Sequence, residues 1–334
     1  MQNLHSCKLK LARRKSKTPP IVWLGQSVRT TIVTKRYPSL ATECWMASLG
    51  DAIHRPRLVE RVFSADLRGH LAVQGPIMLD SGGFTTMIKN EGLRVSEVAR
   101  IYEKAHADFF ISLDVPATSN DRKRTRSRKY EETRTNLVQL LQFIDARKLV
   151  PVIHGTSVEE VISNCQGILE IHPSPTLVCV GGLVPLLRRS GRDVGDPNGA
   201  FAWVASVVST VRDHFPMALI HVLGAGSPRT VAATIRCGAD STDSIAWRRA
   251  AGFGTIFLPG TSERFIEPRD RQRPNSRPTL SAKERDLLAE CTCPACVEMI
   301  NFDARIAELA GSYLARAAHN AFVILGEAKT ASIT

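Results

Sequence analysis

The chain has 334 residues, enough for one large α/β domain with a small appendage. It carries 44 Lys and Arg against 32 Asp and Glu, a formal net charge of +12 that favours an anionic partner, with nucleic acid first among them. No apolar run approaches the roughly 20 residues of a membrane span, and the N-terminus lacks the apolar core of a signal peptide, so we expect a cytoplasmic protein that does not engage a membrane.

The N-terminal segment, residues 1–20, is basic and contains no acidic residue. We expect a flexible arm there, and an organelle transit peptide is the alternative interpretation. A first short strand follows at 21–25, and residues 38–75 favour mixed helix and loop.

The middle of the chain alternates apolar strands with helices of about 10 to 15 residues. Continuous apolar strands separated by helices predict a buried parallel sheet. After 21–25, we expect strands at 76–80, 109–114, 149–153, 176–180, 218–223 and 240–247. We expect helices at 95–107, at 121–147, from 157 onwards, at 200–213 and at 228–238, and a basic loop at 185–198.

The predicted strands end in an aspartate, a histidine or a pair of glycines. Polar groups gathered at strand C-termini are typical of a TIM (β/α)8 barrel, whose βα loops form the active-site face. A doubly wound α/β sheet is the alternative, but it would be expected to carry a GxGxxG fingerprint after its first strand, and the sequence has none there.

The C-terminal part follows a connector rich in proline and arginine, residues 267–278. Cys291, Cys293 and Cys296 have the spacing C-x-C-x2-C, and a helical stretch with His319 comes after them. Three thiolates on one tight turn and an imidazole from a packed helix are four ligands for a structural, tetrahedral zinc ion (Zn2+). The alternative is three free thiols and an unrelated surface histidine.

These observations divide the chain into three predicted parts. Residues 1–20 form the basic arm, 21–285 the TIM barrel, and 286–334 a small C-terminal zinc-binding helical subdomain.

Six motifs occur in order over roughly residues 75–325: Asp80-Ser81-Gly82-Gly83-Phe84, Ser112-Leu113-Asp114, Gly181-Gly182-Leu183, His221 to Gly226, Asp240 to Asp243, and Cys291/Cys293/Cys296/His319. Together they resemble the tRNA-guanine transglycosylase superfamily. The resemblance implies a TIM barrel with a zinc subdomain that exchanges a guanine in nucleic acid for a free 7-deazaguanine base. Because family members often form dimers, it also makes a homodimer an expectation.

The resemblance implies a role for each matching residue. Asp243 is similar to the family nucleophile, and Asp80 to the second catalytic aspartate, a general acid and base. Asp114 resembles the carboxylate that reads the N1–H and 2-amino donors of the base. The implied substrate-binding set also includes Ser81 and Gly82, which follow Asp80, and the turn glycines Gly181 and Gly182. It further includes His154, at the position of a base-reading glutamine, and Arg249, which comes after the nucleophile.

The exchange of one base for another on the same sugar, with configuration retained, requires two displacements and hence a nucleophile beside an acid/base carboxyl group. Asp243 and Asp80 supply this pair. The alternatives are structural: a loop or helix-capping carboxylate for Asp243, and a turn-forming aspartate for Asp80. For Asp114 the alternative is an ion pair with the basic segment that follows it, and for His154 a passive place in the barrel mouth. His221 we expect to be structural.

Three departures from the family pattern leave the polymer open. Thr85 and His154 stand where tRNA enzymes have glutamines, and Asp243 is followed by Ser-Ile-Ala-Trp, which is closer to a branch that modifies DNA. We predict a tRNA-guanine transglycosylase, with a DNA-guanine transglycosylase as the alternative. A non-catalytic nucleic-acid-binding partner subunit is a further alternative, although it would be expected to have lost a catalytic carboxylate. The target base must be flipped out or single-stranded, and the basic stretches 122–134, 188–192 and 269–277 are candidates for phosphate contacts.

Overall fold

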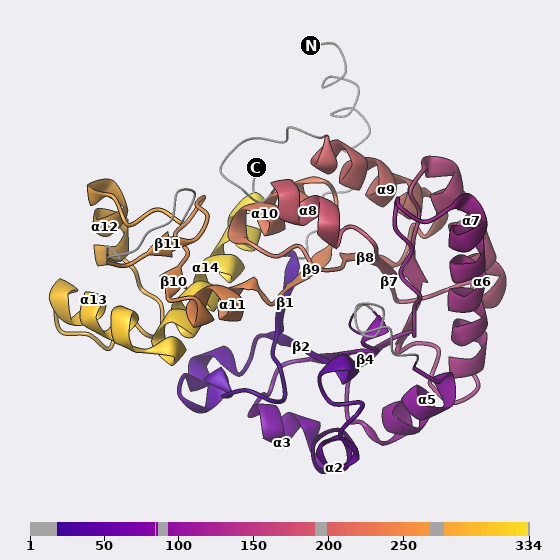
Figure 1. The fold of residues 1–334 in the computed structure, drawn as a ribbon, viewed down its shortest axis with the longest axis horizontal. Helices are drawn as coiled ribbons and strands as arrows, with labels where there is room; N and C mark the ends of the chain where they lie inside the picture. The colour runs from indigo at the N-terminus through magenta and orange to yellow at the C-terminus, as the bar shows by residue number, and fades with distance from the viewer. Residues whose placement is uncertain (1–18, 84, 86–92, 191–198, 268–276, 333–334) are drawn as a thin grey trace.

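The computed structural model describes residues 19–83, 85, 93–190, 199–267 and 277–332 (Figure 1). The predicted arm at 1–20 therefore lies almost wholly outside the described residues. So do Phe84 of the first motif, residues 191–198 of the predicted basic loop, and most of the proline- and arginine-rich connector.

The described strands form one parallel sheet that closes on itself. Strand β1 (Ile21–Gly25) pairs with β2 (Cys44–Ser48) on one side and with β9 (Ser241–Ser244) on the other, so the last strand of the sheet adjoins the first. The sheet continues from β2 through the strands β3 (Ile77–Asp80), β4 (Phe109–Ile111) and β5 (Leu149–Val150). From β9 it continues through β8 (Leu219–Val222), β7 (Leu177–Val180) and β6 (Val152–Ile153).

Pro151 explains why nine strand segments make eight barrel positions. It separates β5 from β6 because proline has no N–H to donate to a neighbouring strand. Its carbonyl still accepts from the Cys179 N–H at 2.9 Å, so 149–153 runs as a single strand between β4 and β7. The architecture is thus a TIM-like (β/α)8 barrel, which confirms the predicted fold class.

Helices surround the barrel, as Figure 1 shows. Most of them match the predicted helices: α5 (Val95–Lys104), α6 (Lys123–Leu140), α7 (Val158–Ile171), α9 (Ala200–His214) and α10 (Pro228–Arg236). Ser227 begins α10 as its N-cap, where its side chain accepts from the Thr230 N–H and Pro228 takes the first helical position. Within the described ranges, no helix combines the length and the apolarity that crossing a bilayer requires.

Three predicted segments differ from the structure. The strand predicted at 240–247 ends at Ser244, because the chain turns at Ile245 and α11 (Ala246–Gly252) begins there. Residues 38–75 contain not only α2 (Pro56–Val59), a π-helical turn (Glu60–Ala65) and α3 (Leu67–Leu71), but also the barrel strand β2. The predicted loop at 185–198 begins instead with a short helix, α8 (Val184–Ser190). Strand β2 and helix α8 are both short, and the periodicity of a short apolar run does not distinguish a strand from a helix or a loop.

The barrel interior is a packed core rather than a channel. Trp23 meets Phe109 edge to face, with 5.9 Å between ring centroids and an interplanar angle of 85°. Side chains from the other strands complete this inner cluster: Met46, Met78, Ile111, Val150, Val152, Leu177 and Cys179. Because the lower barrel is filled, the rim at the strand C-termini is the part of the barrel open to a ligand.

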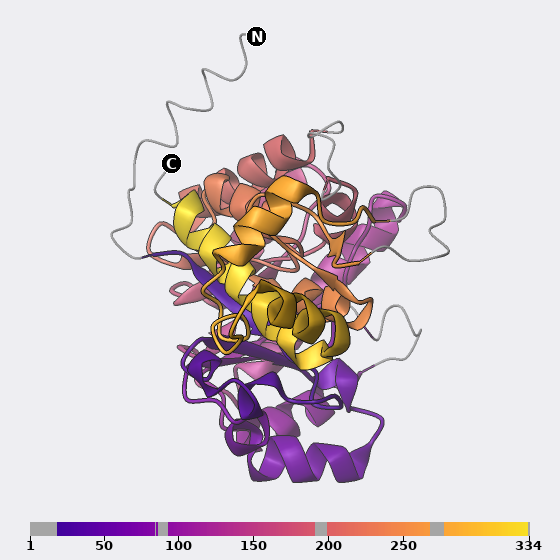
Figure 2. The same ribbon diagram turned by 90° about the vertical axis from the view of Figure 1, so that its left-hand side faces the viewer.

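The C-terminal part lies against one side of the barrel (Figure 2). It comprises α11 (Ala246–Gly252), the antiparallel pair β10 (Thr255–Ile256) and β11 (Arg264–Phe265), α12 (Ala282–Ala289), α13 (Phe302–Gly311) and α14 (Tyr313–Ala331). Helix α14 packs on α10 and α11. Its fully buried Asn320 donates to the carbonyls of Trp247 and Thr255 at 3.1 and 3.2 Å and accepts from the Phe257 N–H at 2.7 Å.

We predict that Asn320→Ala lowers the free energy of unfolding by about 3 kcal/mol or more, because it leaves three buried backbone groups without partners at about 1–3 kcal/mol each. Urea denaturation followed by circular dichroism measures the change. Thr330→Ala, an exposed position on the same helix, is the control and should change the stability little. A loss below about 1 kcal/mol in Asn320→Ala would contradict this account of how α14 is held.

Candidate active site

A cavity of about 300 Å³ opens at the C-terminal rim of the barrel. The three predicted carboxylates, Asp80, Asp114 and Asp243, line it together with Gly181, Gly182 and Arg249. The three carboxylates come, in that order, from the end of β3, from the loop after β4 and from β9. The two glycines follow β7, and the arginine belongs to α11. These elements are distant in sequence but share one rim. The structure therefore brings both members of the predicted catalytic pair to one cavity.

Asp243 is held by donors from the neighbouring strand β8. Its Oδ1 accepts from the Gly224 N–H at 2.6 Å and from His221 Nε2 at 3.3 Å. The fully buried His221 ring also meets Ser241 Oγ through Nδ1 at 2.9 Å. The other carboxylate oxygen, Oδ2, has no hydrogen-bond partner among the described residues, and the side chain is 14% exposed. Asp243 is thus an oriented carboxylate with one oxygen available to the cavity.

Asp80 has a different environment. Its Oδ2 accepts from Ser48 Oγ at 2.6 Å, across the β2–β3 pair. Burial raises the pKa of Asp80 to about 6, and the charges of Asp114 and Asp243 raise it further, against the opposing hydrogen bonds from Ser48 and the Gly82 N–H. A carboxyl group with such a pKa can both release and take up a proton near neutral pH, as a general acid and base must.

Asp114 pairs with His154 rather than with the basic segment after it. Its Oδ2 lies 2.8 Å from His154 Nε2, and the two residues are only 8% and 3% exposed. A carboxylate can only accept, so His154 Nε2 donates. The His154 ring lies behind Asp114 and against Gly181, where an added Cβ would come within 2.5 Å of the ring Cε1. Among the described residues that line the cavity His154 does not appear, and its predicted contact with a base stays a prediction.

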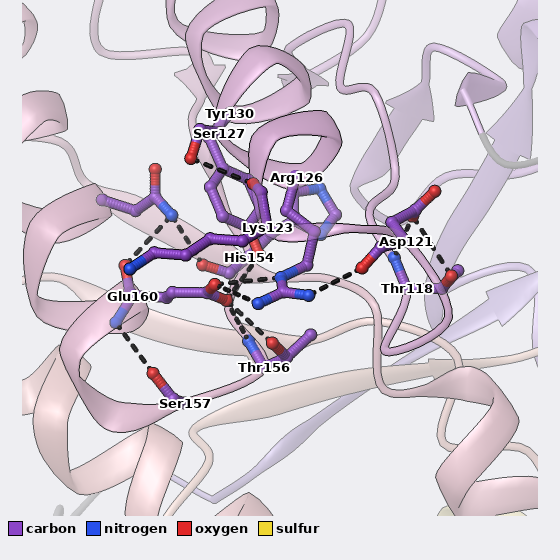
Figure 3. A network of polar contacts seen from close by, with 11 residues as sticks. Thr118, Asp121, Lys123, Arg126, Ser127, Tyr130, His154, Thr156, Ser157 and Glu160 are labelled. Carbon is purple, nitrogen blue, oxygen red and sulfur yellow. Dashed lines mark hydrogen bonds and ion pairs between the residues drawn. The ribbon is translucent and has the colours of Figure 1, made fainter.

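A polar network fixes the loop between β4 and α6 and the start of α7 (Figure 3). Glu160 is its centre: Oε1 accepts from Arg126 Nη2 at 2.8 Å, and Oε2 accepts from Tyr130 at 2.9 Å and from the Thr156 N–H at 2.9 Å. Asn164 Nδ2 donates to the His154 carbonyl at 3.0 Å. The backbone that carries His154 is thus anchored to the same network as α6.

The remaining predicted substrate residues lie at different depths. Ser81 is fully buried, and its hydroxyl donates to the Ser112 carbonyl at 3.3 Å. Gly82 has a φ of 85°, and an added Cβ there would come within 2.4 Å of the Gly50 nitrogen, so the turn after β3 requires glycine. Neither residue lines the cavity in the described part of the chain, whereas Arg249 does. Their contacts with a substrate stay predictions.

Sequence reasoning missed the donors that hold the carboxylates. Ser48 ends a strand that the sequence did not predict, and Gly224 acts through its backbone amide, which no sequence pattern marks. His221 was expected to be structural, and the structure places it against Asp243. A signal was available in the alternation of side chains along β8 and β9. His221 is paired in register with Ser241, and Asp243 lies two residues after Ser241 on the same face of β9, so the alternation places His221 near Asp243.

The four predicted metal ligands converge in the C-terminal part. The ligand atoms of Cys291, Cys293, Cys296 and His319 all lie within 4.8 Å of one another. His319 Nδ1 is 3.5, 3.5 and 3.7 Å from the three sulfur atoms. Tetrahedral zinc, with bonds of about 2.3 Å to sulfur and about 2.0 Å to nitrogen, separates N and S ligands by about 3.5 Å, so the donor set fits the ion.

The second ring nitrogen of His319 supports the same interpretation. His319 Nε2 lies 2.8 Å from the Phe257 carbonyl, which can only accept, so Nε2 carries the proton. The lone pair of Nδ1 therefore points at the sulfur atoms, as metal ligation by histidine requires. Four protein ligands would leave no open position, which is the arrangement of a structural rather than a catalytic site.

A family model described as queuine tRNA-ribosyltransferase matches residues 4–331, nearly the whole chain. The chain belongs to this family. The match spans the barrel rim with its three carboxylates as well as the cysteine–histidine cluster.

Three curated relatives of this chain within the family carry the name tRNA-guanine(15) transglycosylase. The protein from Methanothermobacter thermautotrophicus is 26% identical over 199 residues, 58% of this chain and 28% of its own length. That from Methanosarcina barkeri is 25% identical over 204 residues, with 58% and 39% covered, and that from Methanosarcina acetivorans 23% identical over 269 residues, with 78% and 48% covered. The chain spans less than half the length of these relatives.

We predict that Cys293→Ser loses the bound metal and destabilises the C-terminal part of the protein, because Cys293 is fully buried in the cluster and a serine hydroxyl is a poor zinc ligand. Elemental analysis should find about one zinc per wild-type chain and far less in the variant. Cys237→Ser, outside the cluster, is the control and should keep its metal. A wild-type protein without zinc would refute the site.

We predict that the raised pKa of Asp80 appears in the pH dependence of stability. The folded protein holds the Asp80 proton more tightly than the unfolded chain, so this group stabilises the fold at low pH and loses that contribution as pH rises through about 6. Relative to Asp80→Asn, the wild type should lose roughly 1–2 kcal/mol of unfolding free energy between pH 5 and pH 8. Parallel stability curves for the two proteins in urea would contradict the assignment.

Proposed function

We propose that this chain exchanges a guanine base in tRNA for a 7-deazaguanine base by a double displacement on Asp243. The observation that carries the proposal is the pair of unlike carboxyl groups on one cavity. Asp243 offers an oxygen without a hydrogen-bond partner among the described residues, and Asp80 has a pKa raised to about 6 by burial. Two carboxyl groups in contrasting environments are what a retaining exchange at a sugar carbon requires.

The first displacement uses both groups. Asp243 Oδ2 attacks C1′ of the target nucleotide, the C1′–N bond breaks, and its electron pair leaves with guanine. The carboxyl group of Asp80 supplies the proton that the departing base takes up, which leaves an Asp80 carboxylate and a covalent bond between Asp243 and the sugar.

The second displacement reverses these steps with the incoming base. The Asp80 carboxylate accepts the N–H proton of the free 7-deazaguanine, whose nitrogen attacks C1′ as the bond to Asp243 breaks. Asp243 returns as a carboxylate and Asp80 as an acid, so neither group is consumed. Two inversions at C1′ retain the configuration of the nucleotide.

Recognition of the base falls to Asp114. Its carboxylate lies on the cavity wall, and a guanine edge offers it two donors, the N1–H and the 2-amino group. The hydrogen bond from His154 to Oδ2 holds the carboxylate in place and leaves lone pairs on Oδ1 for the base. The same donors are present on 7-deazaguanines, which explains how one carboxylate would serve both the leaving and the incoming base.

The target nucleotide must leave its stack to reach the rim. The three carboxylates surround a cavity of about 300 Å³ at the strand ends, where C1′ of a stacked nucleotide cannot approach Asp243. The relatives named tRNA-guanine(15) transglycosylase support tRNA as the polymer. The segment Asp243-Ser244-Ile245-Ala246-Trp247 favours DNA as the second candidate, which the experiment below includes.

We predict that the wild-type protein releases guanine from, or incorporates labelled guanine into, tRNA, and that Asp243→Ala reduces the rate by a factor on the order of 10⁴ or more while binding of tRNA stays within a few-fold. Retained radioactivity on acid-precipitated polymer measures the rate. Parallel reactions with tRNA and with duplex and single-stranded DNA identify the polymer. Asp213→Asn, an exposed carboxylate on α9, is the matched control and should keep full activity. Full activity in Asp243→Ala would exclude the mechanism.

A further inference from the structure

Helix α6 carries an unusual concentration of positive charge where it leaves the cavity rim. Between residues 121 and 134 the sequence has seven Arg and Lys side chains, from Arg122 to Arg134, against Asp121, Glu131 and Glu132. The structure separates these cations into two groups with different surroundings.

Three of the seven cations are used within the fold. Arg126 contacts Glu160, Lys129 donates to Asp121 Oδ2 at 2.9 Å, and Arg134 contacts Glu131 and Asn164. Arg126 also donates to the Asp121 carbonyl (Figure 3), and Lys129 donates to the Pro116 carbonyl, both in the loop before the helix. These side chains hold the loop between β4 and α6 in one conformation.

The other four, Arg122, Lys123, Arg124 and Arg128, form what we call the α6 cation group. All four are exposed, and none of them has an ion-pair partner in the part of the chain that the structure describes. Arg124 and Arg128 are one helical turn apart on the face opposite the buried Tyr130, Thr133 and Leu137. Glu132, a turn further on, forms no ion pair with Arg128 within 4 Å among the described side chains.

The α6 cation group begins next to the cavity. Pro116, Ala117 and Thr118 belong to the cavity wall. The Asp121 N–H donates to the Thr118 carbonyl at 3.0 Å, and Asp121 Oδ2 accepts from the Thr118 N–H at 2.7 Å, so the chain turns tightly between the wall and Arg122. A turn of this kind brings the Cα atoms of its first and last residues, here Thr118 and Asp121, within about 7 Å of each other. Arg122, the first cation, is the next residue after this turn.

We propose that the α6 cation group binds the phosphate backbone of the polynucleotide strand beside the nucleotide that enters the cavity. This proposal rests on the proposed function and adds to it the surface that orients the substrate. Exposed cations that form no ion pair among the described side chains complement a polyanion, and a surface held rigid by the ion pairs of Arg126 and Lys129 loses little conformational freedom when it binds. The contact concerns phosphates and carries no base specificity.

The test compares two variants with equal charge changes. Arg122→Gln, Lys123→Gln, Arg124→Gln and Arg128→Gln are combined in one protein. The control combines Lys104→Gln, Arg147→Gln, Lys148→Gln and Arg236→Gln, four exposed cations where helices and loops lead into the N-terminal ends of strands, at the opposite rim. Both variants lose four positive charges, and both keep Arg126 and Lys129, so the loop remains braced. Thermal unfolding verifies that each is folded.

The measurement is the dissociation constant for tRNA and for single-stranded DNA of equal length, at several salt concentrations. We expect the α6 variant to bind at least about tenfold more weakly near 0.1 M salt, with a slope of log Kd against log salt that is shallower by about 3, since each of the four lost phosphate contacts removes about 0.7 to 0.9. The effect on one polymer or both shows which backbone the surface binds.

The proposal would be overturned if the α6 variant had the same slope and affinity as the opposite-rim control on both polymers. The same result is expected if the surface binds an acidic protein instead of a polynucleotide. This outcome is separable from failure of the proposed function. If the wild type exchanges labelled guanine but the α6 variant binds like the control, only the surface assignment falls. If the wild type exchanges no guanine in any polymer, the proposed function falls whatever the slopes.

Discussion

Three carboxylates facing one small cavity repel one another, and the barrel holds them there because each has its own donor. Ser48 donates to Asp80, His154 to Asp114, and the Gly224 amide to Asp243. Each donor comes from a strand, or a strand end, next to the one that carries its carboxylate. The parallel sheet places each donor beside its carboxylate, and closure of the sheet brings the three pairs to one cavity.

The surroundings of the three carboxylates also make them different from one another. Burial and the two neighbouring charges raise the pKa of Asp80, whereas Asp243 receives a backbone N–H and a histidine N–H on a single oxygen. Asp114 is almost wholly buried and shares its hydrogen bond with a buried ring. A proton donor, a nucleophile and a reader of base donors can thus be built from three copies of one side chain, because the environment sets each role.

Much of the fold follows from the sequence because buried strands are apolar runs that end in recognisable residues. Strand β1 was predicted at its observed bounds, and Asp80, Asp114, Gly181 and Asp243 were predicted at the rim. Strand β2 was not predicted, because Cys44–Ser48 is a short run between segments without periodicity. Ser48, which ends this strand and donates to Asp80, was therefore also missed. The place of His154 behind Asp114 depends on a contact between the segments that follow β4 and β6, which no local pattern encodes.

The most direct test of the central claim is to trap the sugar on Asp243. Wild-type protein is incubated with tRNA, quenched in denaturant, digested with nuclease and trypsin, and analysed by tandem mass spectrometry. The account predicts a nucleotide-modified tryptic peptide covering residues 237–248, with fragment ions that place the added mass on Asp243 and not on Asp240. Guanine exchange that proceeds with the adduct on another residue, or with no adduct on this peptide, would contradict it.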